Sequence, residues 1–228
     1  MKQIRINDHT MKITVHRKDI RSLILRIKGP EDLVVSAPYS ATQQEIDRFI
    51  LSRQRWLAEH IEKVIRSSQR TQKDPSGKIM IYGKMTEIQW VIGNGKSSLQ
   101  KDRLVLYIKD TEDHTRQKAF DDFAKSSLQR TAEQLRERWD RVIDDYHLPH
   151  PTLHYRRMSS RWGSCIPAKG KITLNLNLIH YPLACVDAVL WHEYVHLIVP
   201  NHSDRFYAVV LHHMPHYREY HALLNGDL

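Results

Sequence analysis

The residues best suited to chemistry are two histidines four positions apart, with a glutamate directly after the first. On a helix, His192 and His196 share one face, so their imidazoles can bind a single cation. Glu193 can then reach a water held by that cation and take its proton. His202, beyond the helix-ending Pro200, can supply a third ligand. A catalytic zinc has three protein ligands and one open position, whereas a structural zinc has four. This spacing therefore predicts a zinc-dependent hydrolase, with a peptidase as the first candidate.

The residues on both sides of this motif predict that it lies on a buried helix. Apolar residues recur at helical spacing before and after the histidines: Val186, Val189, Leu190, Val195, Leu197 and Ile198. Histidines and a glutamate on such a helix need a partner, because unpaired polar groups in a core are costly. The three histidines have the spacing of H-E-x-x-H-x-x-G-x-x-H, although Val199 replaces the glycine. A β-branched residue tolerates a positive φ poorly, so we expect the turn at Pro200-Asn201.

The first 110 residues predict a mainly antiparallel β region with one long helix. The helix is expected at about 42–68 and begins with the capping-box residues Thr42 and Glu45. Gly93-Asn94-Gly95 predicts a hairpin turn, and the polar stretch 66–77 predicts a linker. Stretches rich in Ile, Val and Leu predict strands at 12–16, 23–28, 33–37, 78–82, 86–92 and 104–109.

The remaining residues predict a compact zinc-binding domain. A second long helix at about 114–147 precedes strands at 153–158 and 171–177, which are joined by a loop that contains residues 161–165. The histidine-bearing helix comes next. Two further helices, at 204–213 and 215–224, are separated by Met214-Pro215. We therefore predict an α+β protein, with a β-rich N-terminal region at 1–110 and a zincin-like metallopeptidase domain at 111–228.

Composition limits the cellular setting and the partners. Hydrophobic residues make up 41% and charged residues 27%, as in soluble globular proteins. No apolar run is long enough to span a membrane and no signal-peptide core is evident, so we expect a cytoplasmic protein without a membrane partner. Two cysteines are too few for a disulfide framework or a cysteine-based zinc site. The net charge of +9 allows a nucleic-acid partner, although most basic residues alternate with acidic ones, as on a solvated face.

An ordered series of motifs in the second half resembles a known family. Residues 157–217 contain RxxxRWGSC, GKITLN, LIHYP, HEYVH, NHSDRF and a final Pro-x-Tyr. This series resembles the YgjP-type, zincin-like metallopeptidase family, which is related in outline to SprT-type zinc proteases. A Val-Ser-Ala-Pro segment at 35–38 and a tryptophan-containing helix after it also fit. The resemblance implies zinc ligands at His192, His196 and His202 and a catalytic Glu193, in agreement with the spacing.

The Trp-Gly-Ser-Cys sequence at 162–165 has a less direct interpretation. Gly163 permits a tight turn or a close backbone approach, and Ser164 could donate a hydrogen bond to a backbone or substrate carbonyl. We expect Trp162 and Ser164 to brace the active site or to contact substrate. A nucleophilic Ser164 or Cys165 is the alternative, but the sequence provides no dedicated base for either.

The strand at 171–177 is the expected place for substrate. It precedes the histidine-bearing helix and is predicted to be a sheet edge, which can pair with an extended peptide. Asn175 is then expected to contact the substrate or to support the ligands from behind.

The predicted reaction is hydrolysis of a peptide bond in a peptide or protein substrate. Zn²⁺ lowers the pKa of its bound water to about 7 and polarises the scissile carbonyl, while Glu193 moves a proton from the water to the leaving amine. The oxyanion donor is left open between Tyr207, His213 and Tyr217. The alternatives are a nucleic-acid-associated, SprT-like protease, a zinc-binding interaction module with little turnover, and a non-peptide amidase.

Overall fold

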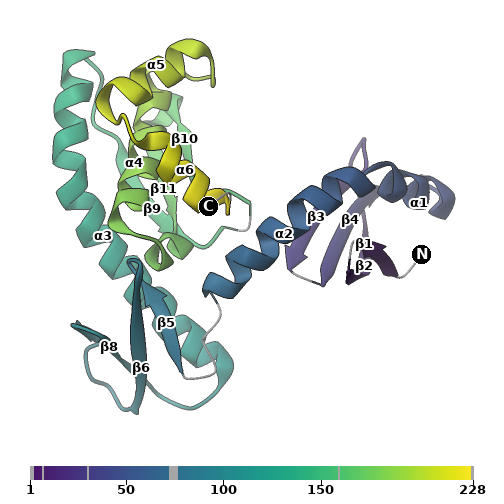
Figure 1. Cartoon of the computed structure of the whole chain (residues 1–228), viewed down its shortest axis with the longest axis horizontal. Helices are drawn as coiled ribbons and strands as arrows, with labels where there is room; N and C mark the ends of the chain where they lie inside the picture. The colour runs from purple at the N-terminus through teal and green to yellow at the C-terminus, as the bar shows by residue number, and fades with distance from the viewer. Residues whose placement is uncertain (1–2, 7, 30, 72–76, 159, 227–228) are drawn as a thin grey trace. The chain divides into compact units, whose positions relative to one another are not determined.

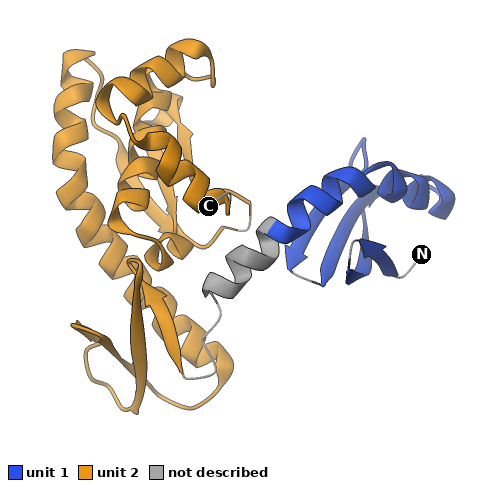
Figure 2. Ribbon diagram, in the orientation of Figure 1, with its two compact units in different colours: residues 1–70 blue, residues 71–228 orange. Residues whose placement is uncertain are grey.

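The chain is divided into two compact units. The computed structural model describes residues 3–6, 8–29, 31–71, 77–158 and 160–226, without the side chains of 63–71. Unit 1 comprises residues 1–70 and unit 2 residues 71–228 (Figure 2). The predicted linker at 66–77 contains this boundary, and its residues 72–76 lie outside the described residues.

Unit 1 is a four-stranded sheet with two helices packed on it. Its helices are α1 (Gln43–Ser52) and α2 (Gln54–Thr71). Its strands are β1 (Gln3–Ile6), β2 (His9–Lys18), β3 (Ile24–Gly29) and β4 (Asp32–Pro38), in the order β1-β2-β4-β3. β2 and β4 are parallel, whereas the other two pairs are antiparallel. Alternate strand residues and one stripe of the helices form the core: Met11, Leu33, Val35, Ile46, Ile50, Leu57 and Ile61.

The long helix predicted at 42–68 is two helices with a break at Arg53. The predicted capping box is present: the Thr42 hydroxyl accepts from the Glu45 N–H, and the Glu45 carboxylate accepts from the Thr42 N–H. At the other end, the Ser52 hydroxyl donates to the Phe49 carbonyl at 2.7 Å. The Arg53 N–H then bonds to the Ile50 carbonyl, three residues back. Local bonds of this kind compete with the regular helical ladder, which accounts for the interruption.

Unit 2 begins with a second sheet of the same topology. Its strands are β5 (Lys78–Ile81), β6 (Lys84–Ile92), β7 (Ser98–Gln100) and β8 (Arg103–Ile108), in the order β5-β6-β8-β7. β6 and β8 are parallel, and the other pairs are antiparallel, as in unit 1. Each sheet is therefore mixed, and two of its three strand pairs are antiparallel, in agreement with the predicted mainly antiparallel region. The Gly93–Gly95 hairpin prediction is wrong, because β6 pairs with β8 and the hairpin turn lies between β7 and β8.

The long helix α3 (Asp113–Asp145) ties this sheet to the rest of unit 2 (Figure 1). Phe120 and Phe123 of α3 belong to one core with Leu104 and Leu106 of β8. The predicted boundary at residue 110 therefore falls inside unit 2, since the second sheet shares its core with the helix that follows it.

A three-stranded sheet and three helices complete unit 2. The strands are β9 (Thr152–Arg156), β10 (Gly163–Ile166) and β11 (Lys171–Asn175), in the order β10-β11-β9. The expected loop at 161–165 thus contains a strand, and the strand predicted to be an edge, β11, is central. Short 3-10 turns follow β10 (Pro167–Lys169) and β11 (Leu176–His180). The helices are α4 (Leu183–Ile198), α5 (Asp204–His213) and α6 (Tyr217–Asn225), with Met214 between the last two as predicted.

Helix α4 is fixed to α3 by its face opposite the histidines. Trp191 of α4 stacks on Trp139 of α3 with ring centroids 4.3 Å apart. The Tyr194 hydroxyl donates to Asp140 at 2.7 Å, and the Trp139 indole N–H donates to Asp187 at 2.7 Å. These stacked rings and buried hydrogen bonds hold α4 in a single orientation. None of the helices among the described residues is long and apolar enough to cross a membrane.

Candidate metal centre

The three predicted histidines meet at one point. His192 and His196 lie on α4, and His202 lies in the connection between α4 and α5. One nitrogen from each ring lies within 4.8 Å of the other two, and the two Nε2 atoms of His192 and His202 are 3.0 Å apart. Two nitrogens bound to one tetrahedral zinc are about 3.3 Å apart. The described part of the chain thus brings the three rings to a separation that fits a single metal ion.

The connection that returns His202 to the site turns without a left-handed residue. Val199 ends α4 in an extended conformation with φ −132° and ψ 101°, and its N–H still bonds to the Val195 carbonyl at 2.8 Å. Bends at Pro200 and Asn201 follow. Because an extended φ suits a β-branched residue, Val199 takes the place of a glycine without strain.

Tyr217 fixes the orientation of His192. The Tyr217 hydroxyl lies 2.7 Å from Nδ1 of His192, and both side chains are largely buried. Burial raises the pKa of Tyr217, so its hydroxyl stays neutral. With Nδ1 donating to the Tyr217 oxygen, the lone pair of His192 is on Nε2, the atom that faces His202. Tyr217 is one of the three candidates for the oxyanion donor, and this geometry instead makes it the hydrogen-bond partner that orients His192.

The Phe206 ring forms an apolar floor beneath the three histidine rings. The Phe206 ring lies 4.7–4.9 Å from all three histidine rings. Burial lowers the pKa of His192 to about 3, with smaller contributions from the neighbouring histidines. Burial also lowers the pKa of His196. Neutral imidazoles are the form that binds metal, so His192 and His196 are ready to do so without losing protons.

Glu193 lies beside the histidines, buried against the backbone of β10. It is 5% exposed. Burial raises the pKa of Glu193 to about 8, and the nearby Arg161 opposes this rise. A Cβ on Gly163 would lie 2.5 Å from Oε1 of Glu193. The glycine of the Trp-Gly-Ser-Cys sequence therefore serves a close backbone approach, one of the two roles that its residue type permits.

The other residues singled out in the sequence have structural partners. All the amide groups of Asn175 are occupied within the chain: its oxygen accepts from the N–H groups of Met158 and Asn177, and its nitrogen donates to the carbonyls of Met158 and Arg161. This makes Asn175 a brace for the segment before β10 rather than a substrate contact. The Trp162 ring packs edge-on against Tyr181 at 4.8 Å, also as a brace.

The possible nucleophiles lie on β10. Ser164 is half-buried and is paired through the strand with Thr173. Burial raises the pKa of Cys165 to about 12, with a smaller contribution from Glu193, so the thiol is protonated and weakly nucleophilic. The geometry therefore gives no support to a cysteine nucleophile.

The other two candidates for the oxyanion donor, Tyr207 and His213, both lie on α5. Tyr207 is 38% exposed on α5, with its ring 6.3 Å from that of His202. His213, at the far end of α5, packs edge-on against Trp191 at 5.2 Å. Trp191 is fully buried and stacks on Trp139 of α3, so His213 packs against the core, whereas Tyr207 lies beside a histidine of the cluster.

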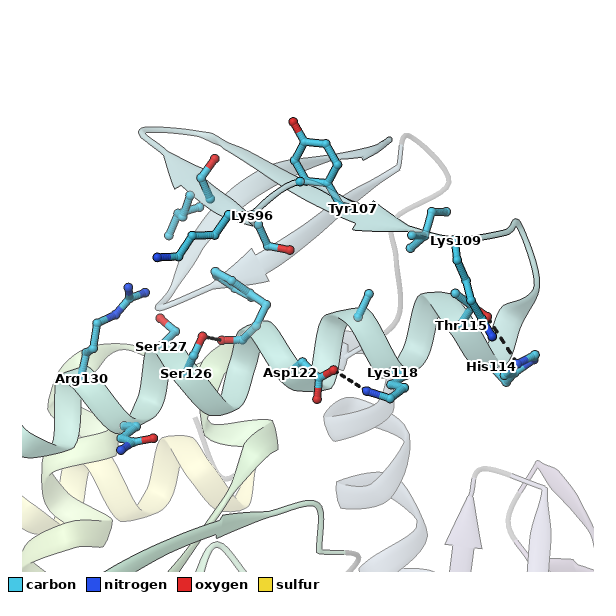
Figure 3. Close-up of a pocket in the computed structure, with 18 of the residues that line it drawn as sticks. Lys96, Tyr107, Lys109, His114, Thr115, Lys118, Asp122, Ser126, Ser127 and Arg130 are labelled. Atoms are coloured by element: carbon cyan, nitrogen blue, oxygen red, sulfur yellow. Dashed lines mark hydrogen bonds and ion pairs between the residues drawn. The ribbon is translucent and has the colours of Figure 1, made fainter. Parts of the chain in front are cut away.

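A separate groove of about 1680 Å³ lies between the second sheet and α3 (Figure 3). Basic side chains line it, among them Lys96, Lys109, Lys118 and Arg130, together with Tyr107 and Phe123. Lys118 is paired with Asp122 at 2.7 Å. None of the predicted site residues lines this groove.

Three histidines around one point, with a buried glutamate next to the first, define a metallohydrolase type of site. The chain belongs to the YgjP-like family, whose metallopeptidase domain model matches residues 21–227. No curated protein matches the chain. Among solved structures, a metallopeptidase zymogen, jannalysin of Methanocaldococcus jannaschii, is 11% identical, with 44% of this chain and 89% of that chain covered and a TM-score of 0.36. A similarity this low says nothing about the fold or activity of this chain.

Proposed function

We propose that the protein is a zinc-dependent peptidase in which Glu193 is the general base. The observation that carries this proposal is the meeting of three imidazoles beside a buried glutamate side chain, in a chain of a metallopeptidase family. An all-nitrogen, three-ligand set suits zinc. When bound, zinc supplies a Lewis acid for the scissile carbonyl and lowers the pKa of water to about 7.

The residues of this chain move the protons and position the substrate. Glu193 accepts the proton of the attacking water and delivers it to the leaving amine. Its burial among apolar groups limits the competing access of bulk water. Tyr217 keeps the His192 ring in one orientation through the hydrogen bond to Nδ1. Tyr207 is the side chain that we propose as donor to the oxyanion.

We place an extended substrate along the outer edge of β10. In the described part of the sheet, β10 pairs with β11 on one side only. β10 begins at Gly163, which touches the carboxylate of Glu193. An unpaired strand edge offers backbone N–H and C=O groups to a peptide, so this edge would lay the substrate backbone next to the general base.

Metal content and one substitution test this proposal. Tag-free protein is expected to contain about one zinc per chain by mass spectrometry, and to cleave denatured casein or a synthetic peptide library. Glu193→Gln keeps the shape of the side chain but not its basicity, so we expect unchanged zinc and a loss of turnover of at least about 100-fold. Glu219→Gln, which removes an exposed carboxylate of α6, is the matched control.

Either of two results would count against the peptidase. If Glu193→Gln cleaved peptides at the wild-type rate, Glu193 could not be the general base. A zinc-loaded wild type that cleaves no peptide would favour a zinc-binding interaction module or a non-peptide amidase.

A second candidate, a nucleic-acid-associated protease, is favoured by the distribution of charge. Unit 1 has 14 Lys and Arg against 8 Asp and Glu, so it carries +6 of the net +9 in less than a third of the chain. A basic unit attached to a hydrolase unit suits a polyanionic partner. Stimulation of peptide cleavage by single- or double-stranded DNA, lost at high salt, would support this candidate, and cleavage indifferent to DNA would remove it.

A further inference from the structure

The segment that leads into β10 contains two arginines with different surroundings. Arg157 is engaged within the chain: it is paired with Asp121 at 3.4 Å from Nε and also donates to the side-chain oxygen of Asn177. Arg161 is exposed, and no described residue offers its guanidinium a hydrogen bond or an ion pair. An arginine presents five donors in a planar fork, which is best satisfied by a carboxylate or a similar anion.

The backbone beneath Arg161 is held firmly. The Asn175 side-chain nitrogen donates to the Arg161 carbonyl at 2.8 Å, and the Asn175 N–H donates to the Trp162 carbonyl at 2.9 Å. The Trp162 ring is packed against Tyr181. The backbone that carries the exposed guanidinium is therefore fixed, so less conformational freedom is lost when the guanidinium binds a ligand.

This arginine lies next to the catalytic carboxylate. Gly163, two residues after Arg161, touches Glu193. The positive charge of Arg161 lowers the pKa of Glu193 against the larger effect of burial. Despite this proximity, Arg161 acts on Glu193 through its charge alone and makes no hydrogen bond to it. Arg161 thus remains available to a ligand that reaches Glu193.

The direction of β10 indicates which part of a substrate Arg161 would meet. A peptide that adds to β10 in the antiparallel sense, which is the slightly more stable pairing and the one that β11 already makes with this strand, would run from the level of Ile166 toward Gly163, with its scissile bond at Glu193. Beyond Gly163 the protein chain continues backward to Arg161. The residues of the substrate that follow the scissile bond are therefore the ones that approach this guanidinium.

We propose that Arg161 binds a carboxylate on the C-terminal side of the scissile bond and so sets the specificity of the enzyme. The carboxylate can come from an Asp or Glu side chain in the first two positions after the cut, or from the free C-terminus of a substrate that ends there. This inference rests on the proposed peptidase function. It adds the substrate class, which is peptides with an anionic group beyond the cut.

A cleavage profile tests the proposal and distinguishes the two sources. Zinc-loaded protein is incubated with a synthetic decapeptide library made with either a free or an amidated C-terminus, and the cleavage sites are read by mass spectrometry. Enrichment of Asp or Glu after the cut in both libraries identifies the side chain as the source. Cleavage near the C-terminus that disappears on amidation identifies the terminal carboxylate.

Four variants connect either preference to Arg161. Arg161→Gln is expected to lower the cleavage of favoured peptides about 10- to 100-fold, as for a lost charge-assisted hydrogen bond, while neutral peptides are cleaved as before. Arg161→Lys keeps the charge without the fork and recovers part of the preference. Arg161→Glu shifts the preference to Lys and Arg after the cut, a gain that a misfolded protein could not show. Arg156→Gln, on the opposite edge strand β9, is the matched control and leaves the profile unchanged.

A binding measurement separates this inference from the peptidase proposal. Fluorescein-labelled alanine peptides with Glu or Gln at the second position from the end, each as free acid and amide, are titrated against zinc-loaded Glu193→Gln with and without Arg161→Gln. Tighter binding of the anionic peptides that Arg161→Gln abolishes supports the carboxylate site, even where no peptide is cleaved. Cleavage without any acidic or terminal preference, or a preference that Arg161→Gln leaves intact, overturns it.

Discussion

Gly163 touches the carboxylate of Glu193 so closely that no side chain could stand between them. A Cβ on residue 163 would lie 2.5 Å from Oε1 and 2.7 Å from Cγ of Glu193. The absence of a side chain is therefore what lets the start of β10 reach the face of α4 that carries the histidines. At this contact the start of the edge strand β10 lies directly against the side chain of Glu193.

Gly163→Ala is expected to displace Glu193 and to lower kcat/KM at least about 100-fold, because an ångström of misplacement in a catalytic group is enough for such a loss. Overpacking of this buried position should also cost about 1–3 kcal/mol of unfolding free energy. Zinc content should be unchanged, since the atoms nearest to the added Cβ all belong to Glu193 and not to a histidine. Steady-state kinetics, zinc analysis and denaturant titration measure the three effects.

Gly170→Ala is the control for that experiment. Gly170 lies in the connection between β10 and β11 with φ +52°, and nothing lies within 4 Å of a Cβ built on it. An alanine there is strained but makes no clash, so stability falls by about 1 kcal/mol while activity persists. An equal fall in kcat/KM in both variants would show that Gly163 acts through general stability and not through Glu193.

The local features of the site could be predicted from the sequence. The four-residue spacing of His192 and His196 fixes their common face on any helix, and the apolar residues around them require that helix to be buried. The return of His202 needs only a short connection whose length is visible in the sequence. These features depend on residues close together along the chain.

The features that depend on distant residues could not be predicted. Whether β11 is an edge or a central strand is decided by its pairing with both β9 and β10, and a sequence pattern does not show strand order. The contact between Gly163 and Glu193 joins residues thirty positions apart, so the glycine alone indicated only that some close approach was permitted. The sequence offers Tyr217 only as one of three candidates for the oxyanion donor. Its hydrogen bond to His192 depends on how α6 packs on α4.

Tyr217→Phe is expected to weaken zinc binding about 10- to 100-fold, as for other lost hydrogen bonds behind a metal ligand. The phenyl ring keeps the packing of α6, so the unfolding temperature of the zinc-free protein should change little. Competition with a chromophoric chelator measures the affinity. Tyr220→Phe, on the same helix, is the control, and unchanged affinity in Tyr217→Phe would mean that His192 needs no partner at Nδ1.

His202→Ala is expected to lower zinc content and affinity more than Tyr217→Phe does, because it removes a ligand and not its support. His202 is the exposed member of the cluster, so the truncation should leave the core intact. Zinc analysis beside His212→Ala, a histidine of α5 outside the cluster, provides the comparison. Full zinc retention in His202→Ala would assign the third ligand to another residue.

His180 is a buried histidine outside the candidate metal centre. Its Nδ1–H donates to the Met80 carbonyl at 2.8 Å, and its ring stacks on Phe120 with centroids 5.5 Å apart. Burial lowers the pKa of His180, and the charge of Arg157 lowers it further against the opposing effect of the Met80 bond. The folded protein therefore keeps this ring neutral at a pH where the unfolded chain already binds a proton.

The sign of the pH effect follows from that difference. Above about pH 7 neither state is protonated at residue 180, and its contribution to stability is constant. As the pH falls below about 6.5, the unfolded state takes up the proton first, so the unfolding free energy decreases by up to about 1.4 kcal/mol per pH unit until the folded pKa is reached.

His180→Asn keeps a donor for Met80 but cannot titrate, so its stability should fall less steeply between pH 7 and pH 5. Urea titrations at four pH values, beside His154→Asn as the control for loss of an exposed histidine of β9, measure the slopes. Parallel curves for wild type and His180→Asn would show that the ring is protonated equally in both states, and that its burial does not make unit 2 sensitive to acid.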